Sequence, residues 1–80
     1  MTDTTRPLFR IAREIEQDWK KVNFAARPYL DVLLHANKIT DIYIIGDHHS
    51  TVRGFLANAS TWRSDVAKSI KLELKTMLGE

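Results

Sequence analysis

The sequence contains no cysteine, only three glycines and two prolines, and no long hydrophobic run. Without cysteine the chain cannot form disulfides, thiolate zinc sites or a cysteine nucleophile. The absence also fits a reducing compartment, so we expect a cytoplasmic protein. No stretch approaches the roughly 18–20 apolar residues that cross a bilayer, and the polar residues 1–5 do not resemble a signal peptide. We therefore expect no membrane association.

A chain of 80 residues also has little room for a large core. A domain of this size buries only about 60–65% of the surface of its unfolded chain, so one thin core is expected and a deep substrate pocket is not. The 12 basic and 10 acidic side chains give a net charge of +2. Such a small excess does not indicate a nucleic-acid binder by itself, so the placement of the charges has to decide.

Apolar residues recur at three- and four-residue spacing in four segments, which predicts four helices at residues 6–22, 25–37, 50–59 and 61–78. Short connections between them indicate an all-α fold, a compact four-helix arrangement in one domain over residues 1–80, with 1–5 expected to be disordered. The large side chains expected in the core are Trp19, Phe24, Tyr29, Phe55 and Trp62.

Residues 39–45 are ambiguous because isoleucine and tyrosine favour strands and no other segment offers a partner strand. One interpretation is a loop or short helical turn whose isoleucines fill the core. The other is an edge that pairs with a second chain. The second interpretation makes a candidate interface of four residues, Ile42, Tyr43, Ile44 and Ile45.

A group of basic residues in the first predicted helix forms the candidate binding surface. If the helix is regular, these residues share an arc of roughly 100° opposite the apolar side. They are Arg6, Arg10, Arg13, Lys20 and Lys21. Five cations on one side could bind phosphates or an acidic protein surface, or could simply be a solvated helix face.

The sequence offers no catalytic or metal-binding pattern. His35, His48 and His49 lack the spacing that places two histidines on one helix face, so no metal and no cofactor are expected. The serines lack a Gly-x-Ser-x-Gly turn, and we expect no enzyme. A helix-turn-helix across residues 50–75 would present Arg63, Lys68 and Lys71 to DNA, but its turn lacks the usual glycine.

Short segments of the chain resemble a family of small uncharacterised bacterial proteins that are often encoded near plasmid or phage genes. The segments are DWK at 18–20, PYL at 28–30, NASTWR at 58–63 and LELK at 72–75. The isoleucine-rich residues 39–45 depart from that family. Because the family has no established activity, the resemblance implies an origin and no site residues. We therefore expect a non-enzymatic module that binds another protein, with nucleic-acid binding as the alternative and the oligomeric state open.

Overall fold

Four α-helices make up the regular structure of the residues that the structure describes. The computed structural model describes residues 6–39 and 48–79, and the helices within them are α1 (Leu8–Asp18), α2 (Arg27–Leu33), α3 (His49–Ala57) and α4 (Asp65–Leu78). These two ranges contain no strand. The predicted all-α fold of four helices is therefore confirmed. No helix in these ranges has the length and apolar character needed to span a membrane.

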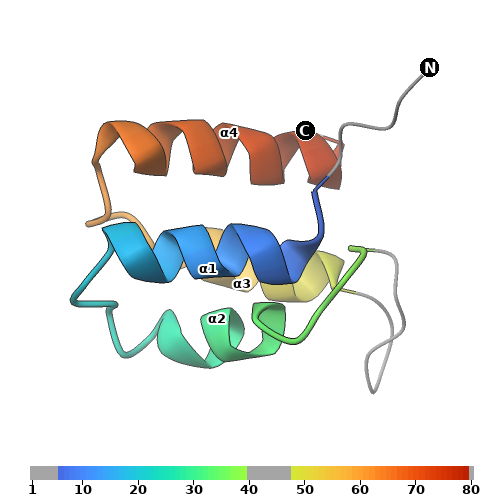
Figure 1. Cartoon of the computed structure of the whole chain (residues 1–80), viewed down its shortest axis with the longest axis horizontal. Helices are drawn as coiled ribbons and strands as arrows, with labels where there is room; N and C mark the ends of the chain where they lie inside the picture. The colour runs from blue at the N-terminus through green and yellow to red at the C-terminus, as the bar shows by residue number, and fades with distance from the viewer. Residues whose placement is uncertain (1–5, 40–47, 80) are drawn as a thin grey trace.

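The four helices pack in a closed ring, so that each helix contacts the next one along the chain and the last contacts the first. Contacts join α1 to α2, α2 to α3, α3 to α4 and α4 back to α1. Figure 1 shows α1 in front of α3, with α4 along one side of this pair and α2 along the other. The radius of gyration, 11.8 Å, is close to the roughly 12 Å expected for a folded chain of this length.

The core lies at the centre of this ring and receives side chains from every helix. The regular spacing of the apolar residues places one stripe of each helix inward. The most deeply buried large side chains are Leu8, Ile11, Ile15, Leu30, Leu33, Val52, Phe55 and Leu74. Because so few residues form this core, each large side chain within it carries a sizeable share of the stability.

Three aromatic rings join the end of α1, helix α3 and the start of α4 inside the core. Trp19 follows α1, Phe55 lies in α3 and Trp62 precedes α4. The two indoles stack with centroids 5.6 Å apart and an angle of 6° between their planes. Phe55 meets each of them edge-on, with centroids 6.2 Å apart in both pairs. Both arrangements are favourable aromatic geometries.

Backbone groups at the helix ends find partners that fix the connections. The N–H groups of Leu8 and Phe9 donate to the carbonyls of Asn37 and Ala36, at 2.7 and 2.8 Å. These bonds satisfy two of the four N–H groups that the start of a helix leaves open. They also tie the start of α1 to the segment after α2.

The caps of α4 follow the usual chemistry of helix ends. Ser64 is the N-cap, and its hydroxyl accepts a hydrogen bond from the N–H of Ala67 at 3.0 Å. Gly79 ends the helix with φ of 83°, a left-handed conformation that glycine adopts without a steric cost.

All four helices are shorter than the sequence predicts: α2 covers only Arg27–Leu33, α3 ends at Ala57 and α4 begins at Asp65. The first prediction extends to residue 22, but Trp19 already leaves the helix with φ −97° and ψ 84° and turns its indole toward Trp62. The segment after Trp19 therefore becomes a connection of its own. In that connection Phe24 is 88% exposed, so its predicted place in the core is wrong.

Two predictions concern residues outside the described ranges. The expected disorder of residues 1–5 is one of them. The candidate interface at Ile42, Tyr43, Ile44 and Ile45 is the other. Of the ambiguous segment only Ile39 is described, and it packs against the core as a partly buried residue.

Candidate interaction surface

The five predicted binding cations do not lie on one helix face. Because α1 covers only Leu8–Asp18, Arg6 precedes it and both lysines follow it. Arg10 and Arg13 are on the helix and exposed, and the Arg13 guanidinium lies 5.4 Å from the centre of the Phe9 ring. The regular helix assumed from the sequence breaks at Trp19, and this break separates the lysines from the arginines.

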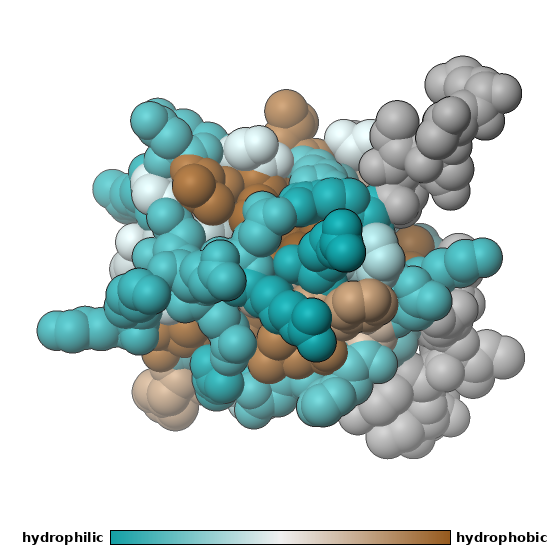
Figure 2. Space-filling model, viewed as in Figure 1, coloured by the Kyte–Doolittle hydropathy of each residue, from teal (hydrophilic) through white to brown (hydrophobic). Residues whose placement is uncertain are grey.

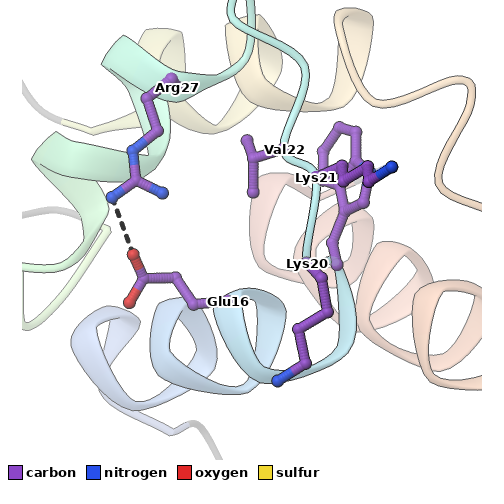
Figure 3. Close-up of a pocket in the computed structure, with 6 residues that line it drawn as sticks. Glu16, Lys20, Lys21, Val22 and Arg27 are labelled. Carbon is purple, nitrogen blue, oxygen red and sulfur yellow. Dashed lines mark hydrogen bonds and ion pairs between the residues drawn. The ribbon is translucent and has the colours of Figure 1, made fainter.

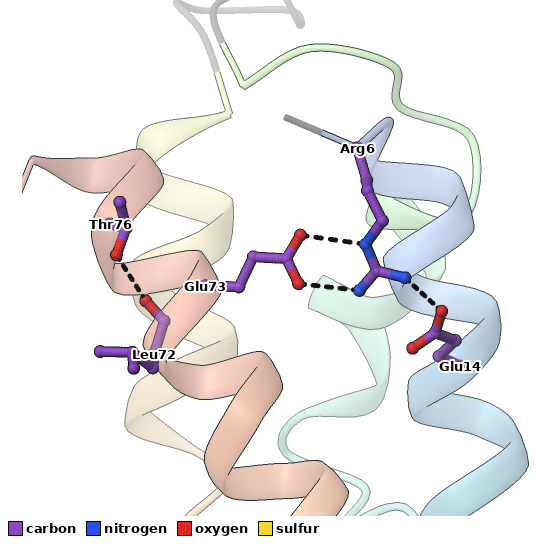
Figure 4. A network of polar contacts seen from close by, with 5 residues as sticks. All are labelled: Arg6, Glu14, Leu72, Glu73 and Thr76. Atoms are coloured by element: carbon purple, nitrogen blue, oxygen red, sulfur yellow. Dashed lines mark hydrogen bonds and ion pairs between the residues drawn. The ribbon is translucent and has the colours of Figure 1, made fainter. Parts of the chain in front are cut away.

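Arg6 is used inside the molecule, where it links the start of α1 to α4. Its Nε and Nη2 donate to the two carboxylate oxygens of Glu73, at 3.0 and 2.8 Å, and its Nη1 donates to Glu14 (Figure 4). Hydrogen bonds to Glu73 and then to Glu14 raise the pKa of Arg6. Two acids therefore already neutralise this predicted binding cation, which leaves four of the five for a partner.

Lys20 and Lys21 belong instead to the connection between α1 and α2, beside a surface pocket of about 440 Å³. Glu16, Trp19, Lys20, Lys21, Val22 and Arg27 line this pocket, here called the Glu16–Arg27 pocket. Figure 3 shows Lys20 running beside α1 and Lys21 on the side opposite the Glu16–Arg27 pair. Both lysines are exposed, and neither forms an ion pair with a described residue.

Arg27, the first residue of α2, closes the pocket on its other side. Its Nη2 donates to Glu16 at 2.9 Å. Its Nε contacts the Asp31 carboxylate at 3.0 Å, and the two residues are four apart on α2. Sequence analysis did not count Arg27 among the binding cations. It joins Lys20 only because the connection folds back and brings the start of α2 beside the end of α1.

Phe24 lies in the same connection and exposes most of its ring. Large exposed hydrophobic residues are few on the described surface: Phe24 at 88%, Leu72 at 67% and Val66 at 40%. On the face seen in Figure 2 hydrophilic side chains predominate, and hydrophobic residues show as separate patches between them. Phe24 lies between the first and second predicted helices, 6–22 and 25–37, and this position was the one signal of its exposure in the sequence.

Asp18, at the end of α1, holds the start of α4 in place. Its Oδ2 accepts hydrogen bonds from the Ser64 hydroxyl and from the Trp62 indole N–H, the latter at 2.7 Å. Both hydrogen bonds lower the pKa of Asp18, and the bond from Ser64 has the larger effect. A second surface pocket of about 420 Å³ lies beside it, lined by Glu14, Gln17, Asp18 and Val66. Its acidic lining distinguishes it from the Glu16–Arg27 pocket.

The lowered pKa of Asp18 predicts a loss of stability in acid. An aspartate of the unfolded chain titrates near pH 4, so below that pH the unfolded chain binds a proton that folded Asp18 still excludes. The free energy of unfolding should therefore fall as the pH drops from about 4 through the folded pKa. Urea titrations from about pH 5 to about pH 2 should show this fall, and Asp18→Asn should make it shallower. Equal slopes for both proteins would contradict the prediction.

The three histidines, and Lys71 of the helix-turn-helix considered above, lie in different parts of the structure. His48 is buried and precedes α3, His49 begins that helix, and His35 is exposed. No group of three acidic or histidine side chains in residues 6–39 and 48–79 is arranged to hold a metal ion. Lys71 donates a hydrogen bond to the Trp62 carbonyl at 2.6 Å, and burial lowers the pKa of Lys71. This cation therefore makes a contact within the protein.

No protein-family model, no curated protein and no solved structure matches the chain. The resemblance to small bacterial proteins noted above stays a prediction, and the function has to be argued from the surface itself.

Proposed function

We propose that the protein is a non-enzymatic, cytoplasmic module that binds another protein through the connection between α1 and α2. The exposed ring of Phe24 carries this proposal. Phenylalanine, like the other aromatic residues, is enriched in the buried centres of protein interfaces, and burial of its side chain contributes about 1.5–3 kcal/mol. The resemblance to bacterial proteins encoded near mobile elements suggests the origin of such a module.

The surroundings of Phe24 support the same proposal. Lys20 and Lys21 are free of ion pairs with described residues and can meet acidic groups of a partner without first losing an internal contact. The pocket beside them gives the surface relief, which flat solvated helix faces lack. An anchor, free charges and a pocket thus occur within one short connection.

Site-specific cross-linking in the native host tests the proposal. Phe24→benzoylphenylalanine should yield a cross-linked protein adduct on irradiation, because the ring would be covered in the complex. Leu72→benzoylphenylalanine is the matched control, since Leu72 follows Phe24 in exposure among the described large hydrophobic residues and lies on α4. An adduct that forms equally at both positions, or an adduct removed by nuclease and not by protease, would contradict the proposal.

Nucleic-acid binding is the alternative, supported by the four exposed cations Arg10, Arg13, Lys20 and Lys21. Binding to phosphates releases counterions, so its affinity falls steeply with salt. A mobility-shift assay with duplex DNA and RNA at low salt distinguishes the two functions. The alternative requires a shift that weakens when Arg10 and Arg13 are both replaced by glutamine.

A further inference from the structure

More cationic than anionic side chains line the Glu16–Arg27 pocket. In it, the carboxylate of Glu16 already accepts a hydrogen bond from Arg27. Lys20, Lys21 and Arg27 line it against the single acid Glu16. Val22 and the indole of Trp19 supply its apolar lining. A ligand that matches this lining carries a negative group next to an aliphatic group.

A carboxylate from another molecule can take the place of Glu16 on Arg27. Both side chains are about four-tenths exposed, 35% for Glu16 and 44% for Arg27. Exposed ion pairs of this kind are weak, because water solvates each charge almost as well as its partner does. A carboxylate from outside can therefore replace Glu16 on Nη2 of Arg27 at little cost, while Asp31 keeps Nε in place.

We propose that this pocket binds a carboxylate side chain of an acidic, aliphatic protein segment, and that Glu16 competes with that carboxylate for Arg27. The inference rests on the proposed function and names the chemistry of the partner. The incoming carboxylate pairs with Arg27 and lies near Lys20, while an aliphatic neighbour in the segment covers Val22, which lines the pocket beside Trp19. Arginine suits this role because its guanidinium carries several N–H donors, so it can hold Asp31 through Nε and a second carboxylate through Nη2.

The acids around Arg27 favour a peptide carboxylate over a nucleic-acid strand. Glu16 and Asp31 both contact Arg27, and a strand that carries a charge on every phosphate would approach both of them. A protein segment can instead place an aliphatic side chain next to each carboxylate and so offers apolar atoms to Val22 and Trp19. Charge and apolar lining thus select the same class of partner.

Fluorescence anisotropy with a short labelled peptide of alternating glutamate and leucine tests the inference on the full chain. Glu16→Gln should bind the peptide about threefold more tightly than the natural sequence, since it removes a competitor of the strength of an exposed ion pair. Arg27→Gln should bind it about tenfold more weakly. Asp65→Asn and Lys75→Gln make the same charge changes on α4 and should leave the affinity within about twofold.

The outcomes separate the inference from the proposed function. The inference is supported if the two pocket variants move the affinity in opposite directions and the peptide with glutamine for glutamate does not bind. If the peptide binds and the pocket variants match their α4 controls, or if no variant binds it, the pocket inference is wrong, while cross-linking at Phe24 still decides the proposed function. A single-stranded oligonucleotide that binds more tightly than the peptide and is released by Arg27→Gln would overturn the inference in favour of nucleic acid.

Discussion

Trp62→Ala should lower the free energy of unfolding by about 3–5 kcal/mol, a large part of the roughly 5–10 kcal/mol expected for so small a domain. The side chain is only 3% exposed and stacks on Trp19 while meeting the edge of Phe55. Its removal would leave a cavity among these rings, and the indole hydrogen bond to Asp18 would be lost with it.

Urea unfolding followed by circular dichroism measures this loss without relying on tryptophan fluorescence. Trp62→Phe is the matched control, because phenylalanine keeps an aromatic ring in the site and lacks the N–H group that Asp18 accepts. It should lie between the natural sequence and Trp62→Ala. A loss below about 1 kcal/mol for Trp62→Ala would show that the aromatic cluster is not the main support of the core.

Gly54→Ala should destabilise the domain by about 1–3 kcal/mol, although alanine in a helix normally stabilises by about 1 kcal/mol over glycine. Gly54 lies inside α3, where the ring of Tyr29 from α2 packs directly on it. A Cβ atom at this position would lie 2.5 Å from Cζ and 2.7 Å from Cδ1 of that ring. Real Cβ atoms do not approach a ring so closely, so α2 or the ring must move.

A double-mutant cycle tests this cause. In the Tyr29→Ala background the ring is gone, and Gly54→Ala should then become neutral or stabilising through its better helix propensity. Thermal unfolding of the four proteins gives the coupling between the two positions. If the effect of Gly54→Ala is the same with and without the tyrosine ring, close packing against Tyr29 is not the reason for the glycine.

The sequence predicted the helices well because their apolar spacing is regular. Ile11 and Ile15, and likewise Ile70 and Leu74, are four apart, and each pair is buried as expected. Such spacing depends only on the rise and twist of the helix, which do not change with the fold. The Arg27–Asp31 pair was predictable for the same reason, since both residues lie on one helix.

The candidate surface was predictable only in part. Arg10 and Arg13 are exposed on α1 as expected, whereas Arg6 is bound to Glu73, which lies sixty-seven residues further along the chain. Nothing in the local sequence announces an ion pair across that separation. The prediction for Phe24 was wrong in the opposite sense, because a residue expected in the core is exposed. Hydrophobicity alone predicts burial and takes no account of the space available inside a thin core.

The sequence by itself thus determined an all-α domain with four helices, their inward stripes and a chain without cysteine chemistry. These features follow from local periodicity and composition, which act over a few residues. The tertiary structure alone decided where α1 stops, because Trp19 leaves the helix to stack on Trp62, a residue of another segment. Because the helix ends at this contact, the residues after Trp19 form a connection, and Lys20 and Phe24 are exposed in it near Arg27.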